Sequence, residues 1–291
     1  MGGVHNLEDQ TAAAADGVCF PVSRVGDRAG APVVLVPGMC DNRRVYWTPG
    51  GAGLANHLAA LGYDVWIIDR RGTRGYEVPA GVRRGWNEAV QLDLPAAQRH
   101  IARHAPFPAI WIGHSYGGVI ISRALGSATL DRAMVAGVVL VGSAIDVPLM
   151  RSRALRRIAR ARVWKDPVPT HVLGFGPEDE YRDQLEDMFA WSDRERQTHS
   201  ATTELATVTV PLLAMPGYRD FLSPPSSCDR LATAYGSTDR QRIQIARRNG
   251  FNSDFGHDTL LMNRRRPRTD VFDAITEWIS SRTHRPAAAS G

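Results

Sequence analysis

The sequence predicts an α/β fold: a doubly wound, mostly parallel sheet that carries a helical lid insertion. Two observations support this prediction. Short apolar runs alternate along the chain with segments of helical periodicity, and such alternation is typical of parallel strands joined by crossover helices. Between residues 147 and 206 the alternation stops and the chain becomes polar and helical, after which the alternation resumes. We therefore expect a sheet core with a helical cap over one of its edges.

Buried strands are expected where the chain is continuously apolar, because a strand covered on both faces needs no alternation with polar residues. An edge strand is expected just ahead of them, within residues 17–25. The buried runs cover residues 32–37, 63–69, 109–113, 137–142, 210–215 and 242–246.

Helices are expected between these strands. Leu54, Leu58 and Leu61 lie on one helical face, and a glycine follows them as a stop. A longer helix is expected over residues 86–105, where Pro95 predicts a kink or a late start. A further helix is expected at residues 116–125. The last helix has its apolar residues at helical spacing on one side: Val271, Ile275, Trp278 and Ile279.

The same pattern predicts the domain organisation. Residues 17–146 and 207–282 are expected to form the core, and residues 147–206 the lid. Residues 1–16 are expected to be a disordered tail, and residues 283–291 a C-terminal tail.

Charge and composition limit the kinds of partner. The net charge is +5, but Lys165 is the only lysine among 35 basic residues. A skew of this kind in an alanine-rich chain favours codon bias over selection for phosphate contacts, so no nucleic-acid partner is expected. The densest basic run, residues 151–162, is interpreted as a solvated face of a lid helix, with a membrane surface or an anionic ligand as the alternatives. No run of 18 apolar residues occurs, so integral membrane association is not expected.

The cysteines and the N-terminal residues predict a cytoplasmic protein. The three cysteines, Cys19, Cys40 and Cys228, have no metal-ligand spacing. Their odd number and an N-terminal stretch without a signal-peptide pattern favour reduced thiols. Neither a metal nor an organic cofactor is expected.

Ser115 is the candidate nucleophile. It lies in "GHSYGG", directly after a buried strand and directly before a helix. A side chain at that point stands at the carboxyl edge of the sheet, where open α/β sheets place their ligands. Gly113 and Gly117 would let the neighbouring backbone pass close to a strained turn. This context favours a nucleophile over an incidental serine.

A serine nucleophile needs a base, and the base needs a carboxylate. His257 follows the last predicted strand and a glycine-bearing loop, so it is expected at the same sheet edge. His114 adjoins Ser115 but is expected to point away from it across the strained turn. Asp220, in "PGYRD" after the penultimate strand, is the expected acid, and Asp146 after an earlier strand is the alternative.

Two backbone N–H groups are expected to bind the oxygen that gains charge during such a reaction. One is the N–H of Tyr116, the residue after the candidate nucleophile, at the positive end of the helix that follows. The other is expected from the "VPGMCDN" loop, where Met39 is the first choice and Cys40 the second.

These motifs resemble the α/β-hydrolase superfamily over residues 17–281. The elbow "GHSYGG", the loops "VPGM" and "DRRGTRG", the acid in "PGYRD" and the base in "FGH" occur in the order of that family. Within it, "PGMCDNRRVYW", "GYDVWIIDRRG" and "DFGHDTLLMN" are similar to the lipase-like branch that includes acid lipases and polyester-synthase relatives. The resemblance implies a carboxylic-ester hydrolase that works through an acyl-enzyme.

Two departures from the family pattern bear on chemistry. Pro37 stands in the oxyanion loop where many relatives carry histidine, which removes a side-chain contact but no backbone donor. The nucleophile is a serine and not an aspartate, which argues against dehalogenase and epoxide-hydrolase chemistry.

The lid is expected to cover an apolar substrate pocket. One stretch of it places apolar residues on one side among acids, either to dock the lid or to form a roof over Ser115. Tyr218, Phe221 and Met39 are expected to line the same pocket. The expected substrate is therefore a small, apolar ester or acyl compound. The apolar lid residues are Leu185, Met188, Phe189 and Trp191.

Other functions remain open at this stage. The same serine, histidine and aspartate would serve an acyltransferase, thioesterase or cyclase, in which a substrate amine or hydroxyl replaces water. A lyase or cyclase without covalent chemistry would use the cavity alone. A small-molecule receptor on a hydrolase scaffold is a third alternative, although the complete set of catalytic residues argues against it. Retention of activity after loss of Ser115 would indicate the second alternative.

Overall fold

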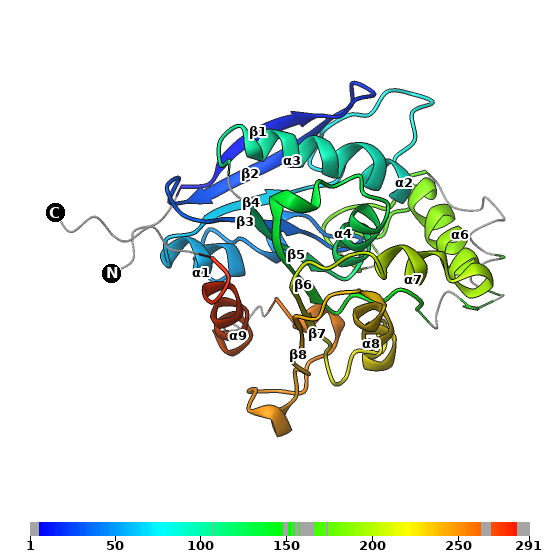
Figure 1. Ribbon diagram of the computed structural model, residues 1–291. Helices are drawn as coiled ribbons and strands as arrows, with labels where there is room; N and C mark the ends of the chain where they lie inside the picture. Colours follow the sequence, from blue (N-terminus) through cyan, green and yellow to red (C-terminus); the bar gives the residue numbers. More distant parts are fainter. Residues whose placement is uncertain are drawn as a thin grey trace.

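The sheet and its flanking helices have the architecture that the sequence predicts (Figure 1). The computed structural model describes residues 6–106, 108–147, 151, 152, 154, 157, 166–172, 174–262 and 269–283. Eight strands form one sheet in the order β1-β2-β4-β3-β5-β6-β7-β8. The pairs β1–β2 and β2–β4 are antiparallel, and every other pair is parallel. The fold class is therefore confirmed.

The strand boundaries follow the predicted runs closely in the middle of the sheet. The last strand begins earlier than expected, although Ile245 still donates its N–H to the Pro216 carbonyl beyond the strand's end. The strands are β1 (Glu8–Ala13), β2 (Cys19–Gly26), β3 (Pro32–Val36), β4 (Asp64–Ile68), β5 (Ala109–His114), β6 (Val135–Val141), β7 (Leu212–Met215) and β8 (Arg240–Arg242).

The N-terminal edge differs from the expectation. Part of the segment expected as a disordered tail, residues 8–13, forms β1, and β2 is consequently an inner strand and not the edge. Because most of its residues are polar, this strand is held in place by backbone pairing with β2 and by a few buried contacts. Ala12 packs into the core, and the Gln10 amide oxygen lies 2.8 Å from His100 Nε2 on a core helix.

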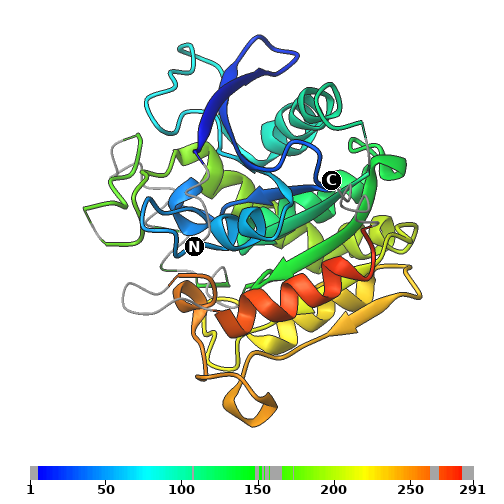
Figure 2. The ribbon, with the colours of Figure 1, turned by 90° about the vertical axis from the view of Figure 1, so that its left-hand side faces the viewer.

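Helices cover both faces of the sheet, and Figures 1 and 2 show α1 and α9 together on one face with α3, α4 and α8 on the other. Alternate strand residues serve the two layers: Val33 and Leu35 pack with α1 and α9, and Val34 and Val36 pack on the opposite side. The helices of the core are α1 (Leu54–Ala60), α2 (Trp86–Glu88), α3 (Leu94–Ala102), α4 (Tyr116–Gly126), α8 (Pro225–Ala234) and α9 (Thr269–Ser280).

The helix predicted over residues 86–105 is continuous in direction but irregular. A π-helical segment, Ala89–Asp93, joins α2 to α3, and Pro95 stands in the first turn of α3. Because helical residues precede it, Pro95 removes one N–H donor from the helix, and its ring crowds the carbonyl four residues earlier. The wider π-helical turn lies directly ahead of α3, which carries Pro95, so the irregularity predicted at this proline is present as that turn.

Within the predicted lid, two helices are described: α6 (Arg182–Thr198) and α7 (Ser200–Leu205). Most of the basic run at residues 151–162 lies outside the described residues. Met188, Phe189 and Trp191 are buried against the core, as the pattern predicts. None of the helices in the described part of the chain combines the length and apolar character needed to span a membrane.

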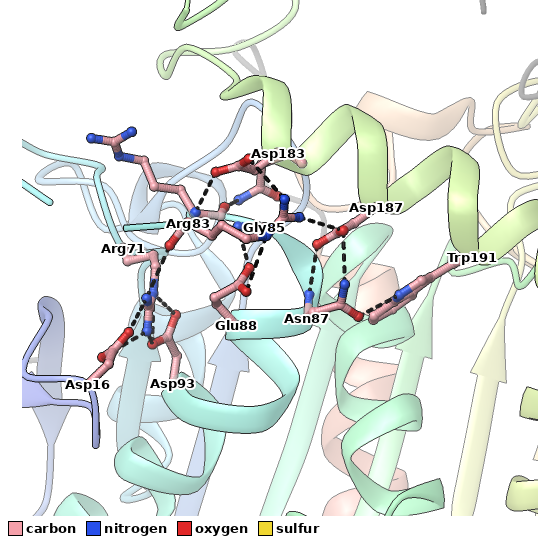
Figure 3. Close-up of polar contacts among 12 residues, drawn as sticks. Asp16, Arg71, Arg83, Gly85, Asn87, Glu88, Asp93, Asp183, Asp187 and Trp191 are labelled. Carbon is pink, nitrogen blue, oxygen red and sulfur yellow. Dashed lines mark hydrogen bonds and ion pairs between the residues drawn. The ribbon is translucent and has the colours of Figure 1, made fainter. Parts of the chain in front are cut away.

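Polar side chains fix α6 to the segment around α2 (Figure 3). Asp187 is 5% exposed and accepts hydrogen bonds from the Asn87 N–H at 3.0 Å, the Asn87 side chain at 2.9 Å and Arg83 at 2.7 Å. Asp183 accepts from the Arg84 N–H at 2.9 Å, and Trp191 donates to the Asn87 side chain at 2.9 Å. The lid thus supplies the carboxylate that caps α2.

Loss of this cap is expected to lower stability. Asp187→Ala leaves the Asn87 N–H without its acceptor and removes one of three carboxylates around Arg83, so the free energy of unfolding in urea should fall by about 1–3 kcal/mol. Glu186→Ala, at the exposed neighbouring position on the same helix, is the control and should stay within about 0.5 kcal/mol of the wild type. Equal stabilities for the two variants would contradict the assignment.

Candidate active site

Ser115 occupies a strained turn between β5 and α4. Its backbone has φ 52° and ψ −121°, in a region that residues with a side chain rarely adopt. The turn fits only because its flanking residues are glycines. A Cβ on Gly113 would collide with the backbone of Gly118, and a Cβ on Gly117 with the carbonyl of Val36. The Ser115 side chain is thereby held at the carboxyl edge of the sheet.

The structure brings Ser115, His257 and Asp220 together in one chain of hydrogen bonds. His257 Nε2 lies 2.7 Å from Ser115 Oγ, and His257 Nδ1 lies 2.7 Å from Asp220 Oδ2. Since an ionised carboxylate only accepts, Nδ1 carries the proton, and Nε2 is left to accept from the serine hydroxyl. This is the geometry that a base needs in order to take the serine proton.

Asp220 is held in place by the turn that carries it. The side chain is buried, and its second oxygen, Oδ1, accepts the Ser223 N–H at 2.7 Å. Asp146, the alternative acid, lies elsewhere: it accepts from Ser192 at 3.2 Å and pairs with Arg151. Among the two candidate acids, the geometry therefore favours Asp220.

His114 packs against His257, a contact that sequence reasoning missed. The two rings have centroids 5.1 Å apart, and His114 Nε2 lies 3.3 Å from the His257 carbonyl oxygen. Its Nδ1 has no hydrogen-bond partner among the described residues. Burial, followed by the nearby His257, lowers the pKa of His114 to about 3, so its ring is neutral at ordinary pH.

Two of the three candidate oxyanion donors are free to bind a ligand. Tyr116 begins α4, where a backbone N–H has no partner inside the helix. The N–H of Met39 has no acceptor in the part of the chain that the structure describes. The N–H of Cys40 donates instead to Glu180 Oε1 of the lid. This bond favours Met39 over Cys40 as the partner of Tyr116.

Two lid residues, Glu178 and Glu180, hold the loop that carries Met39, and we call these contacts the clamp. Glu180 is buried, and its other oxygen accepts from Arg70, also buried, at 2.7 Å. The Glu178 N–H donates to the Cys40 carbonyl at 3.0 Å. Cys40 itself is in the left-handed region at φ 60°, which a residue with a side chain adopts only when its surroundings hold it there. The lid is thus part of what shapes this loop.

A cavity of about 250 Å³ opens onto Ser115 and His257. Its walls are mostly apolar and come from α2, α4, the segment after β6, α6 and the loop after β7, with Trp86, Val119, Ala144, Met188 and Leu222 as their respective residues. The lid therefore contributes a wall through Met188. Met39, Tyr116 and Asp258 also border the cavity.

The two aromatic residues predicted to line this cavity do not border it. Tyr218 is 45% exposed with Arg248 stacked on its ring, and Phe221 is 86% exposed. The tight turn that buries Asp220 directs its neighbours outward, and Leu222 and Ser223 border the cavity in their place. Residue type alone did not reveal which side of that turn each residue would take.

The described residues contain no group of three or more histidine, cysteine or acidic side chains that could hold a metal ion. The three cysteines are free thiols. Burial raises the pKa of the Cys40 thiol to about 12, so that sulfur is not a thiolate nucleophile at neutral pH.

A parallel sheet with a serine on the turn after β5, and a histidine and a carboxylate at the same edge, defines the class of α/β hydrolases. The match to a family model, described as the alpha/beta hydrolase family, covers residues 33–282. The chain belongs to this family, which confirms the resemblance noted from the motifs. No curated protein sequence matches the chain.

Solved structures share the fold at low sequence identity. DcsB, solved in complex with its substrate analogue, is 17% identical with a TM-score of 0.70, covering 96% of this chain and 100% of its own. An esterase from Exiguobacterium antarcticum is 16% identical with a TM-score of 0.68, covering 94% and 99%. A monoacylglycerol lipase from Paleococcus ferrophilus is 18% identical with a TM-score of 0.65, covering 90% and 98%.

The neutral His114 predicts a specific acid sensitivity. In the unfolded chain a histidine titrates near its ordinary pKa of about 6.5, whereas in the folded protein the pKa of His114 is about 3. The unfolded state therefore binds more protons between these values, and stability is lost as the pH falls from about 6.5 towards 3. From this group alone, about 1–2 kcal/mol should be lost between pH 7 and pH 5.

His114→Gln tests this prediction, because the amide can still donate to the His257 carbonyl but does not titrate. Urea denaturation at pH 7, 6 and 5 should show a shallower decline for this variant than for the wild type. His104→Gln, at an exposed position, should keep the wild-type decline. If the His114→Gln curve parallels that of the wild type, the neutral-ring assignment is wrong.

Proposed function

We propose that this protein is a serine hydrolase that cleaves a carboxylic ester through an acyl-enzyme. The observation that carries the proposal is the unbroken chain from Ser115 through His257 to Asp220, with both links at 2.7 Å. That chain ends at the mouth of a mostly apolar cavity. In this proposal Ser115 is the nucleophile, His257 the general base and acid, and Asp220 the carboxylate that orients the ring.

In the first half-reaction, Ser115 Oγ forms a bond to the ester carbonyl carbon while its proton passes to His257 Nε2. The carbonyl electron pair moves onto oxygen, and the N–H groups of Met39 and Tyr116 hold the resulting anion. The intermediate then collapses. Its bond to the leaving alkoxide breaks, and His257 Nε2 returns the proton to that oxygen, which leaves the acyl group on Ser115.

In the second half-reaction, water takes the place of the serine. Its proton passes to His257 Nε2 as its oxygen bonds to the acyl carbon. The new anion collapses with cleavage of the bond to Ser115 Oγ, which recovers its proton from the histidine. Asp220 stays ionised throughout and stabilises the imidazolium that forms twice in each cycle.

The substrate class follows from the cavity. About 250 Å³ with apolar walls suits a small or medium acyl group and offers few fixed polar contacts. The names of two structural neighbours, an esterase and a monoacylglycerol lipase, agree with ester chemistry. We accordingly propose a small, apolar ester or acyl compound as the substrate. The free thiols are compatible with the predicted cytoplasmic location, which stays a prediction.

Covalent labelling tests the nucleophile directly. A fluorophosphonate should add one equivalent to the wild type, as seen by intact mass, and none to Ser115→Ala. Turnover of p-nitrophenyl acetate, butyrate and hexanoate should fall by about 10⁴-fold in the same variant. A panel of esters and thioesters, run with and without amine or alcohol acceptors, separates hydrolysis from acyl transfer through the products formed.

Variants of the two candidate aspartates test which of them orients His257. Asp220→Asn should lower turnover by about 10³- to 10⁴-fold, because the amide no longer fixes the tautomer of His257. Asp146→Asn removes the alternative acid and should leave turnover close to that of the wild type. Full activity of Asp220→Asn would exclude the proposed relay.

The clamp on the oxyanion loop gives a further prediction. Glu180→Met removes the acceptor of the Cys40 N–H, so kcat should fall by about 10- to 100-fold while KM changes little, since the loss falls on the transition state. Glu180→Gln keeps an acceptor oxygen and should be intermediate. Active-site titration with the fluorophosphonate corrects for any unfolded fraction.

Two further variants separate positioning from folding. Arg70→Met combined with Glu180→Met avoids leaving a buried unpaired charge and should retain the low kcat. Asp187→Asn weakens a different lid contact, at the helix that carries Trp86, and should lower stability with a smaller loss of kcat than Glu180→Met. A double variant with the wild-type kcat would show that the clamp does not position Met39.

A further inference from the structure

A second, smaller cavity lies beside the first. It measures about 30 Å³ and is bordered by α4, α6 and the segment after β6. It is also bordered by Arg123, Trp191 and Ser192, none of which borders the first cavity. The two cavities share several walls, among them Met188, whose unbranched side chain adapts readily to a ligand. The shared wall residues are Trp86, Val119, Ala144, Val147 and Met188.

Helix α4 connects the two cavities. Val119 and Arg123 are four residues apart in α4 and so lie on one face of the helix, and Ser115 is the N-cap residue four positions before Val119. Eight residues correspond to about 12 Å along the helix axis. The Arg123 guanidinium lies near Trp191 and Glu195 of α6 and Glu204 of α7, and Arg123 borders the smaller cavity. A chain attached to Ser115 that follows this face would meet the guanidinium.

Arg123 is an unusual residue to find at the end of an apolar cavity. Its side chain is 11% exposed, and its Nε is buried with no hydrogen-bond partner among the described residues. The nearest carboxylate oxygens, of Glu204 at 3.8 Å and Glu195 at 4.0 Å, lie beyond hydrogen-bond distance. Burial lowers the pKa of Arg123, as expected for a cation whose lost hydration is incompletely replaced.

The neighbouring carboxylates do not accept hydrogen bonds from the Arg123 guanidinium. Glu195 caps α7, accepting from the Ala201 N–H at 2.8 Å and from the Thr202 hydroxyl at 2.6 Å. Trp191 offers Arg123 only the face of its ring, 5.0 Å from the guanidinium carbon. The guanidinium therefore keeps donor capacity that an oxygen in the cavity would satisfy.

The charge balance selects the kind of oxygen. Glu195 and Glu204 already balance the charges of Arg123 and of Arg194, the other cation that acts on it. An anion would give this buried group a net negative charge, whereas a hydroxyl, ketone or ether oxygen would accept a hydrogen bond without adding charge.

We propose that the smaller cavity is a subsite for the distal end of the acyl chain and that Arg123 selects chains bearing an uncharged oxygen there. The substrate class is then an ester of an oxygenated acid, with a hydroxyl, keto or ether group remote from the carbonyl. This inference rests on the proposed esterase function and makes it more specific.

Matched p-nitrophenyl esters test the subsite. Sets of equal length, from four to ten carbons, should end in a methyl group, a hydroxyl, a methyl ketone or a carboxylate. The measured quantity is the ratio of kcat/KM for the oxygenated ester to that for its plain partner. At the best length the wild type should favour the oxygenated ester by about 10-fold, because a site with a buried donor discriminates against a partner that lacks the acceptor.

Variants of Arg123 test whether this residue causes the preference for oxygenated esters. Arg123→Met should lower the ratio to about 1 or below, while plain esters are still turned over and the fluorophosphonate still labels Ser115. Arg123→Lys, which keeps a donor, should be intermediate. Arg132→Met is the control, because that arginine binds carbonyl oxygens at the C-terminal end of the same helix, outside both cavities, and it should keep the wild-type ratio.

The outcomes separate this inference from the proposed function. Labelling and plain-ester turnover without a preference for oxygenated chains, or a preference unaffected by Arg123→Met, would overturn the subsite alone. A preference for chains ending in a carboxylate would overturn the choice of an uncharged oxygen. Absence of both Ser115 labelling and ester turnover would overturn the proposed function and the subsite with it.

Discussion

The close approach between the turn at Ser115 and the end of β3 is the constraint on which the site depends. The backbone of Gly117 passes so near the Val36 carbonyl that no side chain fits between them. Ser115 is held at a positive φ in consequence, at a cost of about 1–3 kcal/mol. The packed sheet offsets that cost, so the position of the serine is set by buried strands and not by a loop.

The lid is fixed to the core chiefly through carboxylates that accept backbone N–H groups. Glu180 accepts from Cys40, and Asp183 and Asp187 accept from the N-terminal residues of α2 and the turn before it. These bonds reach both the oxyanion loop and the helix that carries Trp86, a wall of the cavity. Lid docking and assembly of the site are therefore coupled, whereas apolar contacts alone would allow the lid to slide.

The sequence predicted what depends on neighbours along the chain. Continuous apolar runs identify the buried strands, and the glycines around Ser115 identify the turn. Once the strands are ordered, His257 and Asp220 are expected at the same edge of the sheet as Ser115. The fold and its serine, histidine and acid were therefore accessible. The polar strand β1 was not, because its order comes from backbone pairing with β2, which leaves no periodic pattern.

Two kinds of feature could not be predicted from the sequence. One is contact between side chains that are distant in the chain, and the other is the direction in which a turn points its side chains. Arg70 and Glu180 are 110 residues apart, and no local spacing marks them as partners. Tyr218 and Phe221 flank the buried acid, yet the turn directs both outward. His114 was expected to point away from Ser115. The unforeseen part was its contact with His257.

That contact bears on how the base can work. A second positive charge 5.1 Å from the His257 ring would oppose formation of the imidazolium by about 3 kcal/mol at an effective dielectric constant near 20. Burial prevents this by keeping His114 neutral, while the N–H on its Nε2 still contacts the backbone of His257. The base thus has a carboxylate hydrogen-bonded to its Nδ1 and an uncharged ring packed against it. Of the two charges that develop in the proposed reaction, Asp220 is placed to stabilise the imidazolium, and the N–H groups of Met39 and Tyr116 are placed to hold the oxyanion.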